Sequence, residues 1–245
     1  MVNKRYPSKK QLKRHHRLLT KLKMLVWGIV LGFVLVSALS CILLRWIPPL
    51  TSTFMLYRHA EDFIYDNSFK AIDYQWVAAN IISANAFKAV IASEDQRFFE
   101  HYGFDLNAIS NAIESYIDGG GLRGASTLSQ QVAKNVFLVP SKNFIRKGLE
   151  VWFTVLIEIF WGKERILEVY MNIAEFGDHI FGIEAASQRY FGLPAYKLNA
   201  QQAALLAATL PNPIVLRALQ PSTHVVRRQQ WILRQMPNII YPRMG

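Results

Sequence analysis

The chain has 245 residues, of which 51% are hydrophobic, and it carries a formal net charge of +11 and a single cysteine. One cysteine excludes an intrachain disulfide, so a domain outside the cytoplasm must be stable on its core alone. The charge is local, because nine Lys and Arg lie between Lys4 and Lys23 with no acid among them. From Met24 onward, 19 basic residues face 17 acidic ones. An apolar segment follows the basic tail directly, which favours a membrane-topology signal, and we expect no nucleic-acid partner.

Residues 24–44 contain no charge. At ~1.5 Å per residue this segment is about 31 Å long as a helix, enough to cross a hydrocarbon core of ~30 Å. It exceeds the apolar region of a cleaved signal peptide, so we interpret it as an uncleaved signal anchor. Ser40-Cys41 suggests a lipoprotein instead, but the residues before Cys41 match a lipobox poorly. The positive-inside rule then places 1–23 in the cytoplasm and 45–245 outside it.

Beyond this anchor, Pro48-Pro49 ends any helix and begins a linker. A capping box formed by Thr127 and Gln130 marks a helix start, and the glycine-rich residues 118–124 indicate a mobile loop. Strand signals are weak throughout, so we expect a mainly α domain. The helical patterns cover residues 76–99, 108–117, 127–137, 146–160, 163–173 and 200–210.

A pair of carboxylates, Glu94-Asp95, follows an apolar run and makes residues 93–105 the most informative stretch. If one helix continues through it, Glu94, Phe98 and His101 share a face. A carboxylate among apolar and aromatic neighbours can act as a general base near neutral pH. A solvated helix end with a buried Phe explains this stretch about equally well.

Further clusters downstream decide between these interpretations. In chain order the chain contains SEDQRFFEHYGFD (93–105), GASTLSQQVAKN (124–135), RKGLE (146–150), KERILEVYMN (163–172) and GIEAASQRYFG (182–192). Together they resemble the ordered motifs of the peptidoglycan glycosyltransferases, glycosyltransferase family 51, over roughly residues 51–236. Five motifs in order are far more specific than one short match. No Ser-x-x-Lys occurs, so we expect a monofunctional member without a transpeptidase domain.

This resemblance implies a lysozyme-like glycosyltransferase domain with a smaller, membrane-proximal jaw lobe, preceded by one transmembrane helix. It also implies that the substrates are lipid II and a lipid-linked glycan chain. The glycan is transferred from its lipid diphosphate to the 4-hydroxyl of the incoming lipid II, with inversion, to build β-1,4 glycan strands. The bilayer is then a partner, and proteins of cell division or cell-wall synthesis are further candidates.

This transfer needs a base for the hydroxyl proton and cations for the diphosphate. We expect Glu94 to be the base and Glu150, four residues after Arg146, to orient the cations. The predicted diphosphate cluster contains Lys134, Lys142, Arg146 and Lys147. By resemblance, Asp95, Phe98 and His101 support the first site, and Ser126, Thr127, Gln131 and Asn135 line the cleft.

Several of these residues have simpler explanations. Helix capping alone accounts for Ser126 or Thr127, and surface polarity accounts for Gln131 and Asn135 nearly as well. A lone histidine such as His101 is more often structural than catalytic. We expect no required cofactor, although a divalent cation, Mg²⁺ or Mn²⁺, at Glu150 is an alternative to purely cationic neutralisation.

Two other functions compete with the transferase. A lytic transglycosylase needs only one glutamate, but it acts on a neutral glycan that gives the Lys and Arg cluster no role. A non-catalytic membrane scaffold gives no reason for two glutamates to occur with that cluster. The chain departs from the family pattern at Met171, where Leu is usual, and at Gln202, where Glu is usual. Neither change removes an acid with a predicted role.

Overall fold

The computed structural model describes residues 9–66, 68–119, 124, 126–141 and 143–241. It divides into two units, Met1–Leu43 and Leu44–Gly245. The described part of the first unit belongs to one helix, α1 (Lys9–Leu44). Its segment His16–Leu44 is long and apolar enough to cross a membrane, with a mean hydropathy of 2.5. The helix therefore begins well before the predicted span, and its first turns contain the basic residues from Lys9 onward.

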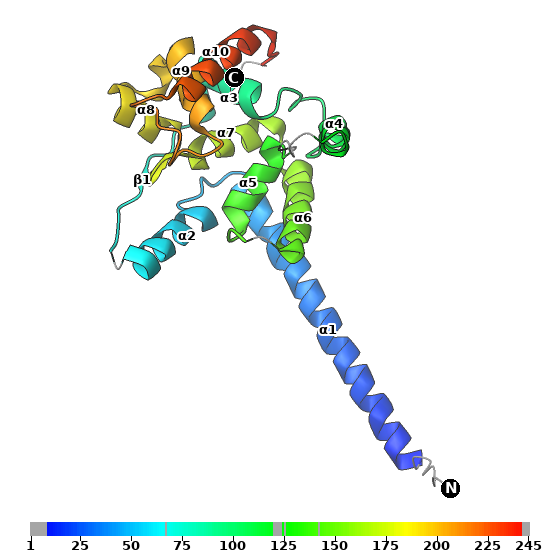
Figure 1. The fold of residues 1–245 in the computed structure, drawn as a ribbon. Coiled ribbons are helices and arrows are strands. Elements are labelled where there is room, and N and C mark those ends of the chain that lie inside the picture. Colours follow the sequence, from blue (N-terminus) through cyan, green and yellow to red (C-terminus); the bar gives the residue numbers. More distant parts are fainter. Residues whose placement is uncertain (1–8, 67, 120–123, 125, 142, 242–245) are drawn as a thin grey trace. The chain divides into compact units, whose positions relative to one another are not determined.

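The second unit is mainly helical, as predicted (Figure 1). Its α-helices are α2 (Thr53–Glu61), α3 (Ala84–Glu94), α4 (Leu106–Ile117), α5 (Leu128–Phe137), α6 (Phe144–Phe160), α7 (Lys163–Ile173), α8 (Ile183–Phe191), α9 (Ala200–Thr209) and α10 (Thr223–Gln235). A π-helical turn follows α2 at Asp62–Asp66, and 3₁₀ turns occupy Ala79–Ile81, Ala195–Lys197 and Met236–Asn238.

One small sheet accompanies these helices. Its strands β1 (Asp73–Tyr74), β2 (Glu175–Gly177) and β3 (Ile180–Phe181) are ordered β1-β3-β2. Strand β1 runs parallel to β3 with Asp73 opposite Ile180, and β2 runs antiparallel to β3 across an irregularity between Glu175 and Gly177. These strands are two or three residues long, which explains why sequence periodicity does not reveal them.

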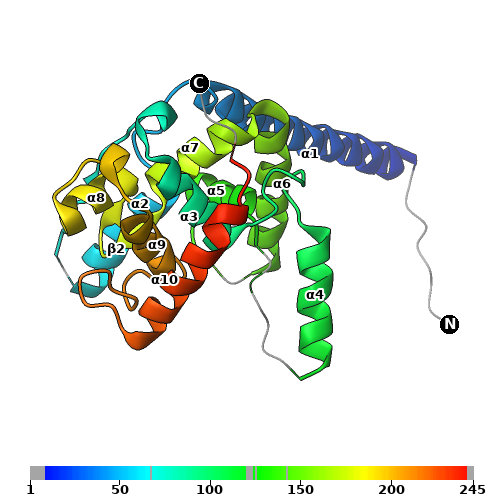
Figure 2. The ribbon, with the colours of Figure 1, turned by 90° about the horizontal axis from the view of Figure 1, so that it is seen from above.

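Helix α7 forms the centre of the core. Its apolar residues Ile166, Leu167, Val169 and Ile173 are all fully buried. Helix α5 packs on α6 and α7, and α10 packs on α9, which in turn packs on α3. Figure 2 shows α3, α5 and α7 in the middle of this unit, with α9 and α10 on one side and α6 on the other. The ends of α3 and α5 therefore meet between these two sides.

The predicted single helix over 76–99 is wrong. A 3₁₀ turn ends at Ile81, Ile82 is extended, and Ser83 begins α3 by accepting a hydrogen bond from the Asn85 N–H. The helix ends at Glu94 because Asp95 has φ −162° and ψ 76°. Glu94, Phe98 and His101 therefore do not share a helix face.

Other local predictions are confirmed. The helices predicted at 108–117, 127–137, 146–160, 163–173 and 200–210 occur as α4, α5, α6, α7 and α9, with ends within two residues of those predicted. The capping box of α5 is complete, because Thr127 and Gln130 each accept a hydrogen bond from the other's backbone N–H. Residues 120–123 of the predicted glycine-rich loop, and Lys142, lie outside the described residues.

Candidate active site

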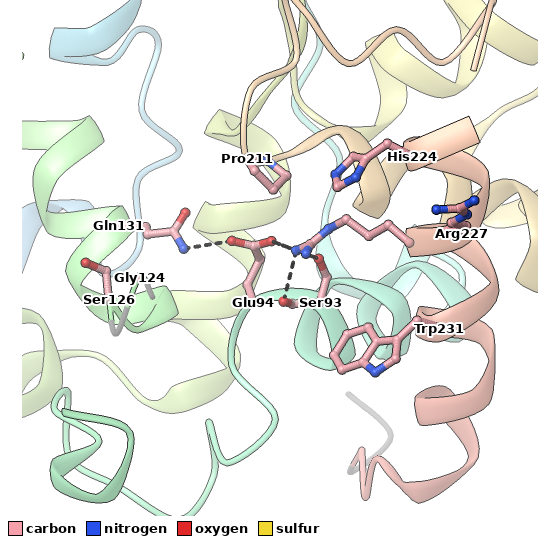
Figure 3. Close-up of a pocket in the computed structure, with 10 residues that line it drawn as sticks. Ser93, Glu94, Gly124, Ser126, Gln131, Pro211, His224, Arg227 and Trp231 are labelled. Carbon is pink, nitrogen blue, oxygen red and sulfur yellow. Dashed lines mark hydrogen bonds and ion pairs between the residues drawn. The ribbon is translucent and has the colours of Figure 1, made fainter. Parts of the chain in front are cut away.

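Glu94 is the last residue of α3, and its carboxylate accepts hydrogen bonds from three directions. Oε1 accepts from the Ser93 hydroxyl at 2.8 Å and lies 3.4 Å from an Arg228 guanidinium nitrogen, while Oε2 accepts from the Gln131 amide at 3.1 Å. Its nearest partners are therefore donors, not the apolar and aromatic side chains we expected. This arrangement fixes the orientation of the carboxylate (Figure 3).

The Gln131 amide is itself oriented from the core. Its Oε1 accepts from the Tyr170 hydroxyl of α7 at 3.3 Å, which leaves its Nε2 to donate to Glu94. Burial raises the pKa of the Tyr170 hydroxyl well above its usual value, with the charge of Glu94 adding to the effect, so this hydroxyl remains a donor. Residues of three predicted motifs thus connect through hydrogen bonds.

Asp95 and His101 form a separate, structural contact. Both oxygens of Asp95 lie near His101 Nε2, at 3.0 and 3.1 Å, and Oδ2 also accepts the Leu128 N–H at 3.0 Å. Phe98 is fully buried beneath this loop. These residues attach the end of α3 to the start of α5, so they support the site without reaching the carboxylate of Glu94.

A second acidic residue, Glu150, lies between two cations on α6. Arg146 Nη1 lies 2.7 Å from Glu150 Oε2, and Lys147 Nζ pairs with Glu150 Oε1. The Glu150 side chain is only 4% exposed, whereas that of Lys147 is 46% exposed. The predicted pairing of Arg146 with Glu150 is confirmed. Two cations around one carboxylate leave a net positive charge that reaches the surface.

Lys134 of α5 lies within the electrostatic influence of both glutamates. Burial lowers the pKa of its ammonium group, and Arg146 and Lys147 lower it further, while the charges of Glu150 and Glu94 raise it. With Gln131 and Asn135 it lines a cavity of about 170 Å³. Lys134 therefore connects the region of Glu94 to the cation cluster of α6.

A cavity of about 830 Å³ contains Glu94. It is lined by Ser93, Glu94, Gly124, Ser126, Gln131, Pro211, His224, Arg227, Arg228 and Trp231. Figure 3 shows Ser126 and Gln131 on one side of Glu94 and His224, Arg227 and Trp231 on the other. The cavity thus extends from α5 to α10 across Glu94.

The structure brings only some of the predicted site residues together. Ser126 and Gln131 lie beside Glu94, Thr127 caps α5 and donates to the Gly103 carbonyl at 2.7 Å, and Asn135 lies beside Lys134. Our sequence interpretation did not include the residues of α10. Their spacing, with His224, Arg228 and Trp231 on successive turns of one face, is the signal that could have identified them.

Glu150 offers little to a metal ion, because each of its oxygens already pairs with a cation. Among the described residues, no group of three His, Cys, Asp or Glu side chains could hold a metal. Both oxygens of Glu150 are thus engaged by Lys and Arg, and the divalent cation considered at this residue stays a prediction.

Comparisons with known proteins agree on one family. The family model described as Transglycosylase matches residues 63–237. A biosynthetic peptidoglycan transglycosylase of Chromohalobacter salexigens is 52% identical over 207 residues, which cover 84% of this chain and 88% of the relative. Proteins of the same name from Pseudomonas fluorescens and Shewanella oneidensis are 48% and 50% identical, covering 89% and 85% of this chain and 88% of each relative.

Proposed function

The chain belongs to the transglycosylase family, and we propose that it is a peptidoglycan glycosyltransferase in which Glu94 is the general base. The observation that carries the assignment of Glu94 is its place in the 830 Å³ cavity, oriented by Gln131 and Arg228. The charge of Glu94 raises the pKa of Lys134. Lys134 thus links this carboxylate to a set of cations suited to bind a diphosphate.

The substrates we propose are lipid II and a lipid-linked glycan chain. In the transfer, the 4-hydroxyl of lipid II gives its proton to the Glu94 carboxylate as its oxygen attacks the anomeric carbon of the glycan. The bond from that carbon to the lipid diphosphate breaks, and the diphosphate leaves with the bonding electrons. Attack opposite the leaving group inverts the configuration at the anomeric carbon.

Lys134, Arg146 and Lys147 have the charge needed to stabilise the departing diphosphate. Lys147 is partly exposed, and Arg146 is held by Glu150 and by the Ser141 carbonyl. Glu150 orients these cations and is already paired with both, which does not suit it as a base. A diphosphate is a good leaving group, so the transfer needs no strong general acid.

The cation cluster also favours a transferase over a lytic enzyme. A finished glycan strand carries no diphosphate, so Lys134 and the Arg146–Glu150–Lys147 group would have no partner in its cleavage. We further propose a single-pass arrangement in the inner membrane, with residues 1–23 in the cytoplasm, 24–44 in the bilayer and the catalytic domain, 45–245, on the periplasmic side. The long apolar helix and the basic residues before it support this arrangement.

The decisive experiment is polymerisation of labelled lipid-linked disaccharide by the detergent-solubilised full chain. Glu94→Gln keeps the shape of the side chain but removes the base, so we expect the rate to fall by ~10²-fold or more. Glu114→Gln, at an exposed position on α4, is the matched control and should be as active as the unmodified chain. Unchanged turnover in Glu94→Gln would refute the assignment of the base, and cleavage of finished sacculi without polymerisation would favour the lytic alternative.

A further inference from the structure

Helix α10 presents a cationic and aromatic stripe to the cavity of Glu94. We define the α10 stripe as His224, Arg227 and Trp231, which line that cavity together with Arg228. None of them belongs to the motifs that identify the family in the sequence. Figure 3 shows His224, Arg227 and Trp231 on the side of Glu94 opposite Gln131, and thus opposite the helix that carries Lys134.

Charge in this cavity is unbalanced. Among the described residues that line it, Glu94 is the one carboxylate, against two arginines. Arg228 is engaged, because its Nη2 donates to the Ser93 hydroxyl at 2.9 Å and lies 3.4 Å from Glu94 Oε1. Arg227 is exposed, and within the described part of the chain no carboxylate lies within 4 Å of its guanidinium. An exposed guanidinium beside a cavity is suited to bind a carboxylate in a bidentate pair.

We propose that the α10 stripe is a subsite for the peptide arm of the substrate, in which Arg227 binds a peptide carboxylate and Trp231 packs against the sugar. This inference rests on the proposed function and adds a recognition element to it. A precursor of peptidoglycan carries anionic groups at two places, the diphosphate at the anomeric carbon and the carboxylates of its peptide. Lys134 and the α6 cations bind the diphosphate, and Arg227 binds a peptide carboxylate.

The size and position of the cavity agree with this assignment. At about 830 Å³ it lies near the upper end of the ~300–1,000 Å³ typical of small-molecule sites, so it has room for a sugar with its substituent. Trp231 is 38% exposed and supplies an aromatic surface. His224 adds a further ring nitrogen at the same wall. A disaccharide whose terminal hydroxyl faces Glu94 can thus extend the peptide of its other sugar toward α10.

The test compares two lipid-linked disaccharide substrates with the full chain in detergent. One carries a peptide with free carboxylates, and the other carries the same peptide with every carboxylate converted to a carboxamide. We expect Arg227→Gln to lower kcat/KM on the acidic substrate by about tenfold, mainly through KM, because a charge-assisted contact is lost. On the amidated substrate the same variant should match the unmodified chain within about twofold.

Two further variants make the outcome specific. Arg234→Gln removes the same charge from an exposed position of α10 that does not line the cavity, and it should behave as the unmodified chain on both substrates. Trp231→Leu should reduce kcat/KM on both, because both contain the sugar. Equal loss on the two substrates in Arg227→Gln, or no loss on either, would overturn the subsite. Failure of the unmodified chain to polymerise either substrate would instead remove the proposed function on which the subsite rests.

Discussion

Lys134 is the residue whose ionisation should set the alkaline limit of activity. It can stabilise a diphosphate only when protonated, and burial lowers its pKa below the ordinary value, so activity should fall as pH rises through that lowered pKa. The charge of Glu150 raises the same pKa. Glu150→Gln should therefore move the alkaline limb of the kcat/KM profile to lower pH, and Lys134→Arg should move it to higher pH.

The control for this prediction is Lys197→Arg, at an exposed lysine that lines neither the cavity of Glu94 nor that of Lys134, which should leave the profile unchanged. A double variant, Lys134→Ala with Glu150→Gln, tests whether the two residues serve one diphosphate site. Their losses should be less than additive, because each single change already disturbs the same contact. Fully additive losses would contradict a shared site.

Arg228 should act differently from its neighbour Arg227, because it positions the base. Its Nη2 donates to the Ser93 hydroxyl, and that hydroxyl donates to Glu94 at 2.8 Å. Arg228→Gln should lower kcat by about tenfold or more while KM changes little, since misplacing a reacting group costs mainly in the transition state. Arg228→Lys, which keeps the charge, should recover part of that rate. A rise in KM at constant kcat would place Arg228 in substrate binding instead.

At the scale of elements, the connection between the end of α3 and the start of α5 depends on Gly103. Its φ is +84°, and an added Cβ would lie 2.7 Å from Cγ2 of Thr154 on α6. Its carbonyl also accepts the Thr127 hydroxyl. We expect Gly103→Ala to lower the free energy of unfolding by about 1–3 kcal/mol, as measured by denaturant titration, because the residue needs a left-handed backbone at close approach.

A second glycine gives the opposite expectation and serves as the control. Gly148 lies inside α6 with nothing within 4 Å of an added Cβ and an ordinary helical backbone. Gly148→Ala should raise the free energy of unfolding by roughly 0.5–1 kcal/mol, the usual helical preference of Ala over Gly. Similar effects of the two substitutions would contradict the role assigned to the turn at Gly103.

Sequence identifies an element when its signals are local. Helix α5 was predictable because its capping box and its amphipathic pattern lie within its own residues, and α7 because five apolar positions repeat at helical spacing. The end of α3 was not predictable, since Asp95 leaves the helix to bind the Leu128 N–H, 33 residues further along the chain. In helix α10 only Val225 and Ile232 are buried, and most of the other residues are polar. Its amphipathic pattern in the sequence is therefore weak.

The same distinction applies to the site. The pairing of Arg146 with Glu150 follows from a spacing of four residues on one helix and was predicted. The partners of Glu94 were not, because Gln131 is 37 residues away and Arg228 is 134 residues away. Spacing alone cannot bring such residues together. The resemblance to a family supplied Gln131, whereas only the folded chain places Arg228 beside Glu94.

For the whole molecule, the basic residues before the apolar helix should determine which side of the membrane the domain occupies. Moving this positive charge outward is unfavourable, so the tail should stay in the cytoplasm and the domain should be exported. Protease added to spheroplasts should then digest the domain and leave an N-terminal tag intact. We expect replacement of the nine Lys and Arg between Lys4 and Lys23 by Gln to produce a mixture in which part of the domain is protected.

The control for this experiment is a variant in which nine exposed Lys and Arg of the domain are replaced by Gln instead. Positive charge acts on topology mainly within about 15–20 residues of a transmembrane end and in short loops. Most residues of the domain are farther than that from the helix along the chain. This variant should therefore be exported as the unmodified chain is, although it loses the same total charge. A domain protected in the unmodified chain would contradict the topology. A soluble species beginning near Cys41 would mean that the helix is cleaved, and the substrate lipid alone would then have to hold the enzyme at the bilayer.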